Sequence, residues 1–277
     1  MKAFLSGYYR RPISISETYV IAECVACGTL FQRDVPCEDL LNELYDVWIA
    51  PRQPEDDRGY AFDVQHPALS RDGHELMSAA AHLGIPLDQM VVLDWGMGWA
   101  GWARVAASLG CRAHGYDIAQ SRQDLAATYG VAPDNASYDF INTEQFLEHS
   151  TDPRGIVEQL AGKLKPGGIL KISVPGQAKV REVLADISCG RASLSDRRLM
   201  PLHPLEHLNC FSREALTRIG APFGLRPVRP GWLARYAFIG HRGALDLADP
   251  RRTAKELIRP WYQWHSRTNS YIWLRKL

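Results

Sequence analysis

The sequence predicts an α/β protein built on a mostly parallel sheet with helices on both faces. Strand-like and helix-like segments alternate between residue 90 and about residue 175. The strand-like segments are short continuous apolar runs, which are typical of buried parallel strands, and a glycine-rich turn follows the first of them. Ligands of such folds bind beyond the carboxyl ends of the strands, so functional residues are expected at that edge.

The segments between residues 90 and 175 can be assigned in order. The run "MVVLDWG" predicts a strand, and "GWARVAASLG" predicts a helix that ends at Gly110. The next four segments are the strand "CRAHGYDI", the helix "SRQDLAATYG", the strand "YDFINTEQ" and the helix "DPRGIVEQLAGKL". The run "GGILKISVP" predicts the last strand of the series.

The flanking regions are less regular. Residues 72–84 predict a helix, as does "CEDLLNELYDVWI". The segment "FSREALTRIGAPFGL" predicts a helix capped by Ser212, and "SYIWLRKL" predicts a final strand. We therefore expect an appendage over residues 1–60 and a main domain over residues 61–277, with insertions near 177–205 and 240–268.

Composition limits the partners and the compartment. The net charge of +1, with 46% hydrophobic and 23% charged residues, is that of an ordinary soluble protein and argues against a nucleic-acid partner. No apolar stretch approaches the roughly 20 residues that span a bilayer, and the first residues lack the features of a signal peptide. We therefore predict a cytoplasmic protein with no membrane partner. The six cysteines do not suggest a disulfide scaffold, and most are expected to be buried.

The stretch "VVLDWGMGWAGW" carries the main functional signal. Gly96, Gly98 and Gly101 fit the G-x-G-x-x-G pattern of nicotinamide-binding proteins, but this match alone is weak. Asp94 would place a carboxylate near a docked pyrophosphate, which like charges disfavour. A cofactor with a cationic end and no phosphate, such as S-adenosylmethionine (SAM), suits this turn better.

The same turn resembles the first motif of the class I SAM-dependent methyltransferases, D-x-G-x-G-x-G, with Ala100 in place of the third glycine. The segments "YDFINTEQFLEHSTDP", "LKPGGILKISVPG" and "PLEHLNCFSREALTRIGAPFGL" are similar to the subgroup that contains ubiquinone O-methyltransferases and sugar- and natural-product-tailoring enzymes. Together these matches cover most of residues 20–230. The resemblance implies a Rossmann-like methyltransferase fold with a seven-stranded type of sheet, and SAM as the cofactor.

The resemblance also implies which residues hold SAM. Asp117 ends the second strand, where a carboxylate can accept hydrogen bonds from both ribose hydroxyls. Ala100 is harmless if its torsion angles are ordinary; otherwise Gly101 can take the role of the third glycine. The expected cofactor-binding residues are Asp94, Gly96, Met97, Gly98, Trp99, Gly101, Asp117, Ile118 and Gln145.

Two segments depart from the family pattern. Only "APDNAS" lies between Val131 and Tyr138, so the third-strand region is shortened. Either that strand is missing, or Asp134 and Asn135 contact the adenine from a short loop. The segment "ECVACGTLF" resembles half of an N-terminal zinc module. Zinc needs four ligands, and Cys24, Cys27 and Cys37 have no upstream pair, so we expect a degenerate, metal-free remnant.

Methyl transfer to a hydroxyl requires a base, and histidine is the natural one near neutral pH. We predict His149, which follows the fourth strand, with Glu148 beside it and His207 from a later segment as the catalytic residues; a purely structural role for either histidine stays open. Metal-using relatives read E-x-x-E-H, whereas Gln145 stands in the first position here. A neutral amide is a poorer ligand, so no metal is predicted.

The predicted function is methyl transfer from SAM to a small-molecule or glycan-type acceptor, at oxygen. The first alternative is a methyltransferase fold that has lost catalysis and serves as a binding or scaffold protein; Ala100, the shortened third-strand region and the half zinc module favour it. The second alternative is a nicotinamide-dependent oxidoreductase, which only the glycine spacing favours.

Overall fold

The computed structural model describes residues 20–43, 58–193, 197–202, 206–246, 248–266 and 268–277. The strands are β1 Ile21–Glu23, β2 Leu30–Gln32, β3 Val91–Trp95, β4 Arg112–Tyr116, β5 Ala132–Pro133, β6 Tyr138–Glu144, β7 Leu164–Pro175, β8 Asn209–Cys210, β9 Leu225–Val228 and β10 Asn269–Lys276. The helices are α2 Glu38–Glu43, α3 Arg58–Gln65, α4 Arg71–Leu83, α5 Gly101–Ser108, α6 Gln120–Thr128, α7 Pro153–Lys163, α8 Ala178–Ser188, α9 Arg213–Gly220, α10 Trp232–Arg235 and α11 Pro250–His265.

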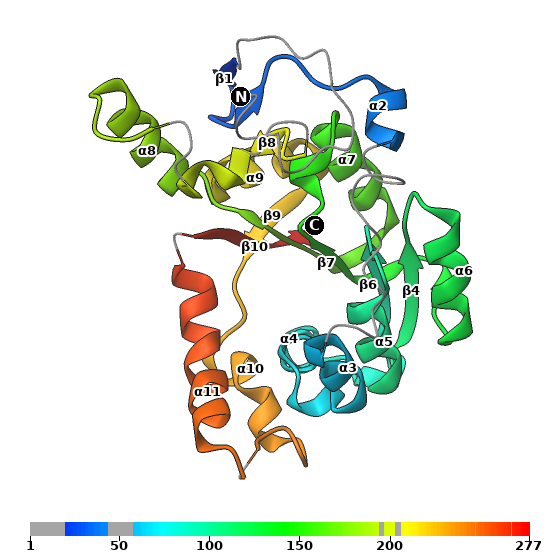
Figure 1. The fold of residues 1–277 in the computed structure, drawn as a ribbon. Coiled ribbons are helices and arrows are strands. Elements are labelled where there is room, and N and C mark those ends of the chain that lie inside the picture. Colours follow the sequence, from blue (N-terminus) through cyan, green and yellow to red (C-terminus); the bar gives the residue numbers. More distant parts are fainter. Residues whose placement is uncertain (1–19, 44–57, 194–196, 203–205, 247, 267) are drawn as a thin grey trace.

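The main element is a seven-stranded sheet in the order β5-β4-β3-β6-β7-β10-β9 (Figure 1). The pairs from β5 to β7 are parallel, and β10 runs antiparallel to both of its neighbours. The predicted α/β fold is therefore confirmed. The last strand of the chain returns to the sheet between β7 and β9, as its apolar run "SYIWLRKL" allows.

Helices cover both faces of this sheet, and each face has its own core. On one face, Val157 of α7 and Leu216 of α9 pack against the sheet with Ile141. On the other, Leu76 of α4 and Trp102 of α5 pack against it. The helix α9 begins where the sequence predicts, because the Ser212 hydroxyl accepts a hydrogen bond from the Ala215 N–H at 3.0 Å.

The third-strand region is short, as expected. The strand β5 has two residues and pairs with β4, and the chain then returns directly to the start of β6. Asp134 accepts a hydrogen bond from the Tyr138 hydroxyl at 2.7 Å and pairs with Lys163 Nζ at 2.7 Å. Tyr138 begins β6, and Lys163 ends α7 directly before β7, so Asp134 faces the amino ends of the strands and not the edge where the cofactor is expected.

The described part of the appendage packs against the later chain. The hairpin β1–β2 forms a small sheet with β8, and Glu23 of β1 pairs with Arg181 of α8 at 2.7 Å. The boundary at residue 60 stays a prediction. Among the six free thiols only Cys111 and Cys210 are buried, so the expectation that most cysteines are buried is wrong.

Within the described residues, no helix has both the length and the apolar composition that crossing a bilayer requires.

A buried lysine links the sheet to the helices on one face. Lys171 lies in the middle of β7 and is 1% exposed. Its Nζ donates to Asn142 Oδ1 at 2.7 Å and forms ion pairs with Glu144 and, at 3.6 Å, with Glu75. Burial favours the neutral amine, but the charges of Glu144 and Glu75 outweigh it and raise the pKa of Lys171. The ammonium group therefore stays charged inside the protein.

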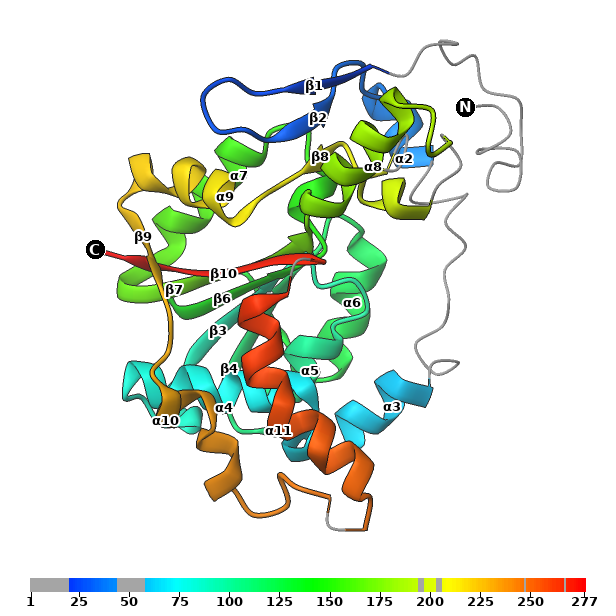
Figure 2. The same cartoon turned by 90° about the vertical axis from the view of Figure 1, so that its left-hand side faces the viewer.

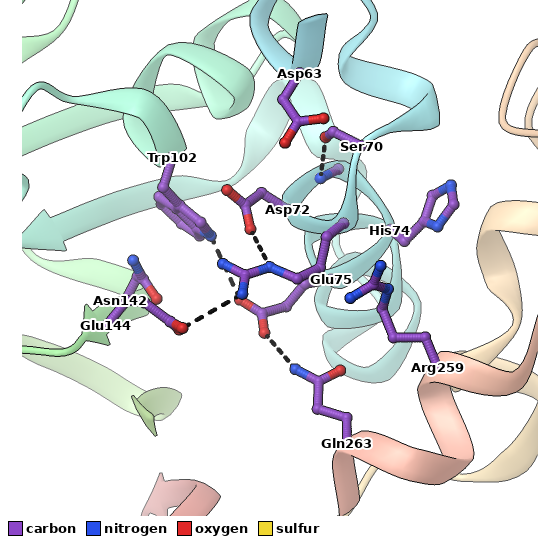
Figure 3. Close-up of polar contacts among 12 residues, drawn as sticks. Asp63, Ser70, Asp72, His74, Glu75, Trp102, Asn142, Glu144, Arg259 and Gln263 are labelled. Atoms are coloured by element: carbon purple, nitrogen blue, oxygen red, sulfur yellow. Dashed lines mark hydrogen bonds and ion pairs between the residues drawn. The ribbon is translucent and has the colours of Figure 1, made fainter. Parts of the chain in front are cut away.

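Glu75 accepts hydrogen bonds from three further elements, and Figure 3 shows those from Trp102 and Gln263. Its carboxylate accepts from Tyr271 Oη of β10 at 2.7 Å, from Gln263 Nε2 of α11 at 3.2 Å and from Trp102 Nε1 of α5 at 3.4 Å. This network, the Lys171 network, places α4, α5 and α11 relative to the sheet.

Substitution of Lys171 is expected to destabilise the fold strongly. Lys171→Met leaves the buried Glu75 without the Lys171 cation and leaves Glu144 with Arg71 alone, which costs about 3–5 kcal/mol of unfolding free energy. The matched control is Lys165→Met. Lys165 is 39% exposed and pairs with Asp139 at 2.8 Å, so its loss costs about 0–1 kcal/mol. Urea unfolding measures both variants, and equal losses would contradict the proposed importance of the Lys171 network.

Candidate functional site

The glycine turn lies between β3 and α5, at the carboxyl edge of the sheet. Gly96 and Met97 donate their N–H groups to the Tyr116 carbonyl at 2.9 and 3.0 Å, which attaches the turn to the end of β4. Gly96 and Gly98 have φ angles of +74° and +52°, in the left-handed region that glycine adopts without strain.

The surroundings of these two glycines differ. A Cβ atom at Gly96 would lie 2.2 Å from Phe146 Cδ2, so an aromatic ring fills the space on that side. A Cβ atom at Gly98 would meet no atom within 4 Å. The backbone at Gly98 therefore faces open space, as expected where a ligand approaches the turn closely.

Ala100 also lies in the left-handed region, with φ 60° and ψ 26°. This conformation costs an alanine about 1–2 kcal/mol. Its methyl group is 1% exposed and packs with Met97, Ala103 and Val131. Since Gly101 is the first residue of α5, Ala100 and not Gly101 holds the position of the third glycine.

Asp117 fastens the end of β4 to the turn. Its carboxylate is 4% exposed and accepts hydrogen bonds from the Gly98 N–H at 2.9 Å and the Ala119 N–H at 3.1 Å. Arg122 Nη1 lies 3.2 Å from Oδ1 and 3.4 Å from Oδ2. Arg122 thus holds the acceptor positions on which the predicted ribose contact depends. The next residue, Ile118, is 79% exposed, and an apolar side chain there can cover an aromatic base.

The other predicted cofactor residues also lie at this edge. Trp99 is partly exposed, and its ring lies 5.6 Å from the Arg122 guanidinium. Asp94 is buried, and its Oδ1 accepts a hydrogen bond from Asn142 at 2.7 Å. Burial raises the pKa of Asp94 to about 7, although the hydrogen bond from Asn142 opposes this shift. A cationic group of a ligand nearby would favour its ionised form, which fits the ammonium group of SAM.

The chain that follows β6 brings a second turn against the first. Gln145 has a φ of +52°, and its N–H donates to the Ser173 carbonyl at 2.8 Å. A non-glycine residue in this region is strained, and such strain is often found at functional sites. The next residue, Phe146, packs against Gly96 and against Trp95, whose ring centroid is 6.4 Å away.

The three predicted catalytic residues lie together. Glu148, His149 and His207 each offer one donor atom, and these atoms lie within 4.8 Å of one another. The two imidazole rings are 4.8 Å apart and nearly perpendicular. Glu148 is fully buried, neither of its carboxyl oxygens has a hydrogen-bond partner among the described residues, and burial raises its pKa to about 8.

Backbone carbonyls orient both histidines. His149 Nδ1 lies 2.9 Å from the Glu206 carbonyl, and His207 Nδ1 lies 2.9 Å from the Met200 carbonyl. A carbonyl only accepts, so Nδ1 carries the proton in each ring and Nε2 keeps its lone pair. Burial also lowers the pKa of His207, which favours its neutral form. A basic nitrogen near a buried carboxyl group can move a proton; the same three side chains also have the composition of a cation site.

The sequence did not predict a cavity of about 470 Å³ between α3, the start of α4 and α11. It is lined by Phe62, Asp63, Arg71, Asp249, Arg251, Arg252, Lys255, Glu256 and Arg259. Arg71 joins the cavity to the sheet edge, because its Nη1 lies 3.4 Å from Glu144 Oε1 and its Nε donates to Asp72 at 2.9 Å. The charge of Asp72 raises the pKa of Arg71. The only sequence signal for this cavity was the basic run "PRRTAK".

A family model described as a methyltransferase domain matches residues 66–229. The chain is similar to 1,6-didemethyltoxoflavin-N1-methyltransferase of Burkholderia thailandensis, solved with 1,6-didemethyltoxoflavin and S-adenosylhomocysteine (TM-score 0.49, 16% identity, 92% of this chain and 99% of that chain). It is also similar to a putative sarcosine dimethylglycine methyltransferase of Galdieria sulphuraria (TM-score 0.43, 18% identity, 73% of this chain and 83% of that chain). A third similar structure is a putative methyltransferase of Haloferax volcanii in complex with the Trm112 activator (TM-score 0.44, 15% identity, 80% of this chain and 95% of that chain). No curated protein matches the chain.

Substitution of the two glycines is expected to separate stability from binding. Gly96→Ala combines left-handed strain with a clash against Phe146, so it should lower the unfolding free energy by about 2–4 kcal/mol. Gly98→Ala has room for its methyl group and should cost only about 1–2 kcal/mol. Its methyl group would point into the open space, however, and should weaken S-adenosylhomocysteine binding about tenfold or more. Thermal unfolding and calorimetric titration measure both effects. Unchanged binding by Gly98→Ala would place the cofactor elsewhere.

The stability of the protein is expected to fall between pH 4.5 and about 8 because of Glu148. Its folded pKa is raised, so the folded state holds a proton that the unfolded state has lost across this range, and stability decreases as the pH rises through it. Glu148→Gln cannot ionise and should flatten the profile in urea unfolding, whereas Glu158→Gln, an exposed position on α7, should not. Parallel profiles for wild type and Glu148→Gln would show that Glu148 has another partner.

Proposed function

Because the chain belongs to the methyltransferase-domain family, as a class I SAM-dependent methyltransferase with a Rossmann-like fold, we propose that it methylates an oxygen atom of a small-molecule or glycan-type acceptor. The observation that supports this proposal is the cluster of Glu148, His149 and His207 beside the turn that follows β6. Histidine side chains are suited to accept the proton of a hydroxyl group, and the lowered pKa of His207 favours the neutral ring that this step needs.

SAM supplies a methyl group on a sulfonium, which is a good leaving group. In the proposal, the open backbone at Gly98 and the buried carboxylate of Asp94 hold the cationic end of the cofactor. Asp117 binds the ribose and Ile118 covers the base. Met97, which is 7% exposed, supports the turn from inside. The remaining proposed contacts are Gly96, Trp99, Gly101 and Gln145.

The acid–base step is assigned to His149. Its Nδ1–H donates to the Glu206 carbonyl, so Nε2 is the ring atom that would accept the proton of an acceptor hydroxyl. His207 lies against it and can share or relay that proton. Because the pKa of Glu148 is about 8, this carboxyl group is protonated at neutral pH and adds no negative charge beside the forming oxyanion.

The proposed acceptor site is the cavity of about 470 Å³ beside Arg71. This volume is typical of small-molecule sites. Its lining is mostly charged, which suits the hydroxyl groups of a sugar or an anionic substituent rather than an apolar compound. The likeness to sugar-tailoring enzymes in the sequence agrees with this acceptor class, and the cytoplasm stays the proposed compartment.

The N-terminal hairpin is proposed to be a metal-free remnant of a zinc module. The N–H groups of Cys27 and Ala26 lower the pKa of the Cys24 thiol, as in a metal-binding knuckle. Within the described residues no other pair of cysteines approaches this turn to complete four ligands. The second alternative from the sequence, a nicotinamide oxidoreductase, does not agree with the family of the chain.

Three proteins test the assignment. Wild type and His149→Ala should bind S-adenosylhomocysteine equally in calorimetric titration, and Asp117→Ala should bind it at least about tenfold more weakly. With labelled SAM and a panel of sugar nucleotides and phenols as acceptors, His149→Ala should lower kcat by about 10²–10⁴-fold. A folded wild-type protein that does not bind S-adenosylhomocysteine would favour the scaffold alternative.

A chelator distinguishes a base from a metal ligand in the same assay. The proposed base needs no metal, so turnover should survive EDTA. Loss of turnover with EDTA and its recovery with a divalent cation would assign Glu148, His149 and His207 to a metal and overturn the proton-transfer role.

A further inference from the structure

The helix α11 has an inverted polarity. The side chains that it turns toward the protein are mostly polar: Glu256 is 7% exposed and pairs with Arg259 at 2.7 Å, and Gln263 donates to Glu75. Its solvent-facing side instead carries Leu257, Ile258, Trp261 and Tyr262. A surface helix normally buries its apolar side and exposes its polar side. The outer side of α11 therefore has the composition of a contact surface.

This apolar surface continues onto α10. Trp232 and Leu233 are 63% and 87% exposed. The ring of Trp232 packs on Tyr236 at 4.5 Å, and the Tyr236 hydroxyl donates to the Leu257 carbonyl of α11 at 3.0 Å. In Figure 2, α11 runs along the side of the molecule that faces the viewer, with α10 next to it.

We call this surface the α10–α11 face; it consists of Trp232, Leu233, Leu257, Ile258, Trp261 and Tyr262. Their exposed fractions run from 37% to 87%. Among the described residues, twelve large apolar side chains are exposed, and half of them belong to this face. Such concentration in one place marks an interaction site rather than scattered surface residues.

The charges around the face are positive. Arg251 and Lys255 are exposed on α11, and Arg229 is exposed at its other end, beside His265 at 3.1 Å. The acidic groups of α11 and its cap are the exposed Asp249 and the buried Glu256. Asp249 accepts the Arg251 and Arg252 N–H groups as the cap of α11, and Glu256 is buried.

We propose that the α10–α11 face binds the surface of a lipid bilayer with anionic headgroups. Tryptophan and tyrosine favour the boundary between headgroups and acyl chains, where an apolar ring and a polar atom are both satisfied. A helix of high amphipathicity and low overall hydrophobicity, with cations beside its apolar side, is typical of helices that lie in that boundary. The sequence predicted no membrane partner because it has no spanning segment, but surface binding does not need one.

A second copy of the chain fits this face less well. In a symmetric dimer the same face meets itself, so Arg251 and Lys255 would approach the cations of the other copy. An anionic surface neutralises these charges instead.

Vesicle sedimentation of the full-length protein tests the proposal. Mixed phosphatidylcholine–phosphatidylglycerol vesicles should bind the protein, and pure phosphatidylcholine vesicles should bind it at least about tenfold more weakly. Ile258→Asp and Lys255→Glu should each weaken binding to the mixed vesicles about tenfold or more. The matched controls are Val25→Asp, at a fully exposed position between β1 and β2, and Arg112→Glu, at the exposed start of β4. Both should bind like wild type.

All four positions are exposed, so each variant is expected to fold, and thermal unfolding checks this. Equal binding to both vesicle types, or equal weakening by the controls, would overturn the proposal. Absence of vesicle binding, with a wild-type dimer that Ile258→Asp dissociates in sedimentation equilibrium, would overturn it in favour of a second copy.

Discussion

The buried ammonium group of Lys171 sets the main constraint on this structure. An ion in the middle of a strand is stable only if anions and hydrogen bonds compensate its lost hydration. Glu144 supplies one anion from the neighbouring strand, and Glu75 supplies the other from α4. Glu75 is in turn held by donors from α5, β10 and α11. One charge thus dictates how helices distant in the sequence dock on one face of the sheet.

The same charge reaches the cofactor turn. Asn142 accepts from Lys171 with its oxygen and donates to Asp94 with its nitrogen, so the orientation of its amide is fixed. Asp94 is therefore held by a polar chain that starts at Lys171. Left-handed torsions at Ala100 and Gln145 concentrate backbone strain at the same edge. The packing and the ion pairs of the Lys171 network fix the geometry of the sheet. The sheet can therefore hold the strained residues Ala100 and Gln145 at its edge.

Local patterns explain what the sequence could predict. Apolar runs, the Ser212 cap and the glycine turn act over a few residues, and the elements that they predict between residues 72 and 175, after Ser212 and at the final strand are present. The predicted helix "CEDLLNELYDVWI" is described only as far as Glu43, because residues 44–49 lie outside the described residues. Pairings between distant segments have no such signature: the β2–β8 pair, the Arg71–Glu144 contact and the polar inner side of α11 all depend on the tertiary fold. His149 and His207 could each be selected from a motif, but their contact depends on two backbone carbonyls that no pattern reveals. The left-handed conformation of Ala100 could not be predicted from the sequence either, because alanine prefers negative φ angles.

Both edge strands of the large sheet contain a proline, which affects the tendency of the sheet to aggregate. Pro133 is one of the two residues of β5, and Pro227 lies within β9. Proline has no N–H group to offer a further strand, so both borders of the sheet are poor templates for pairing with another polypeptide. The two prolines therefore discourage the sheet from growing by edge-to-edge pairing into an intermolecular aggregate.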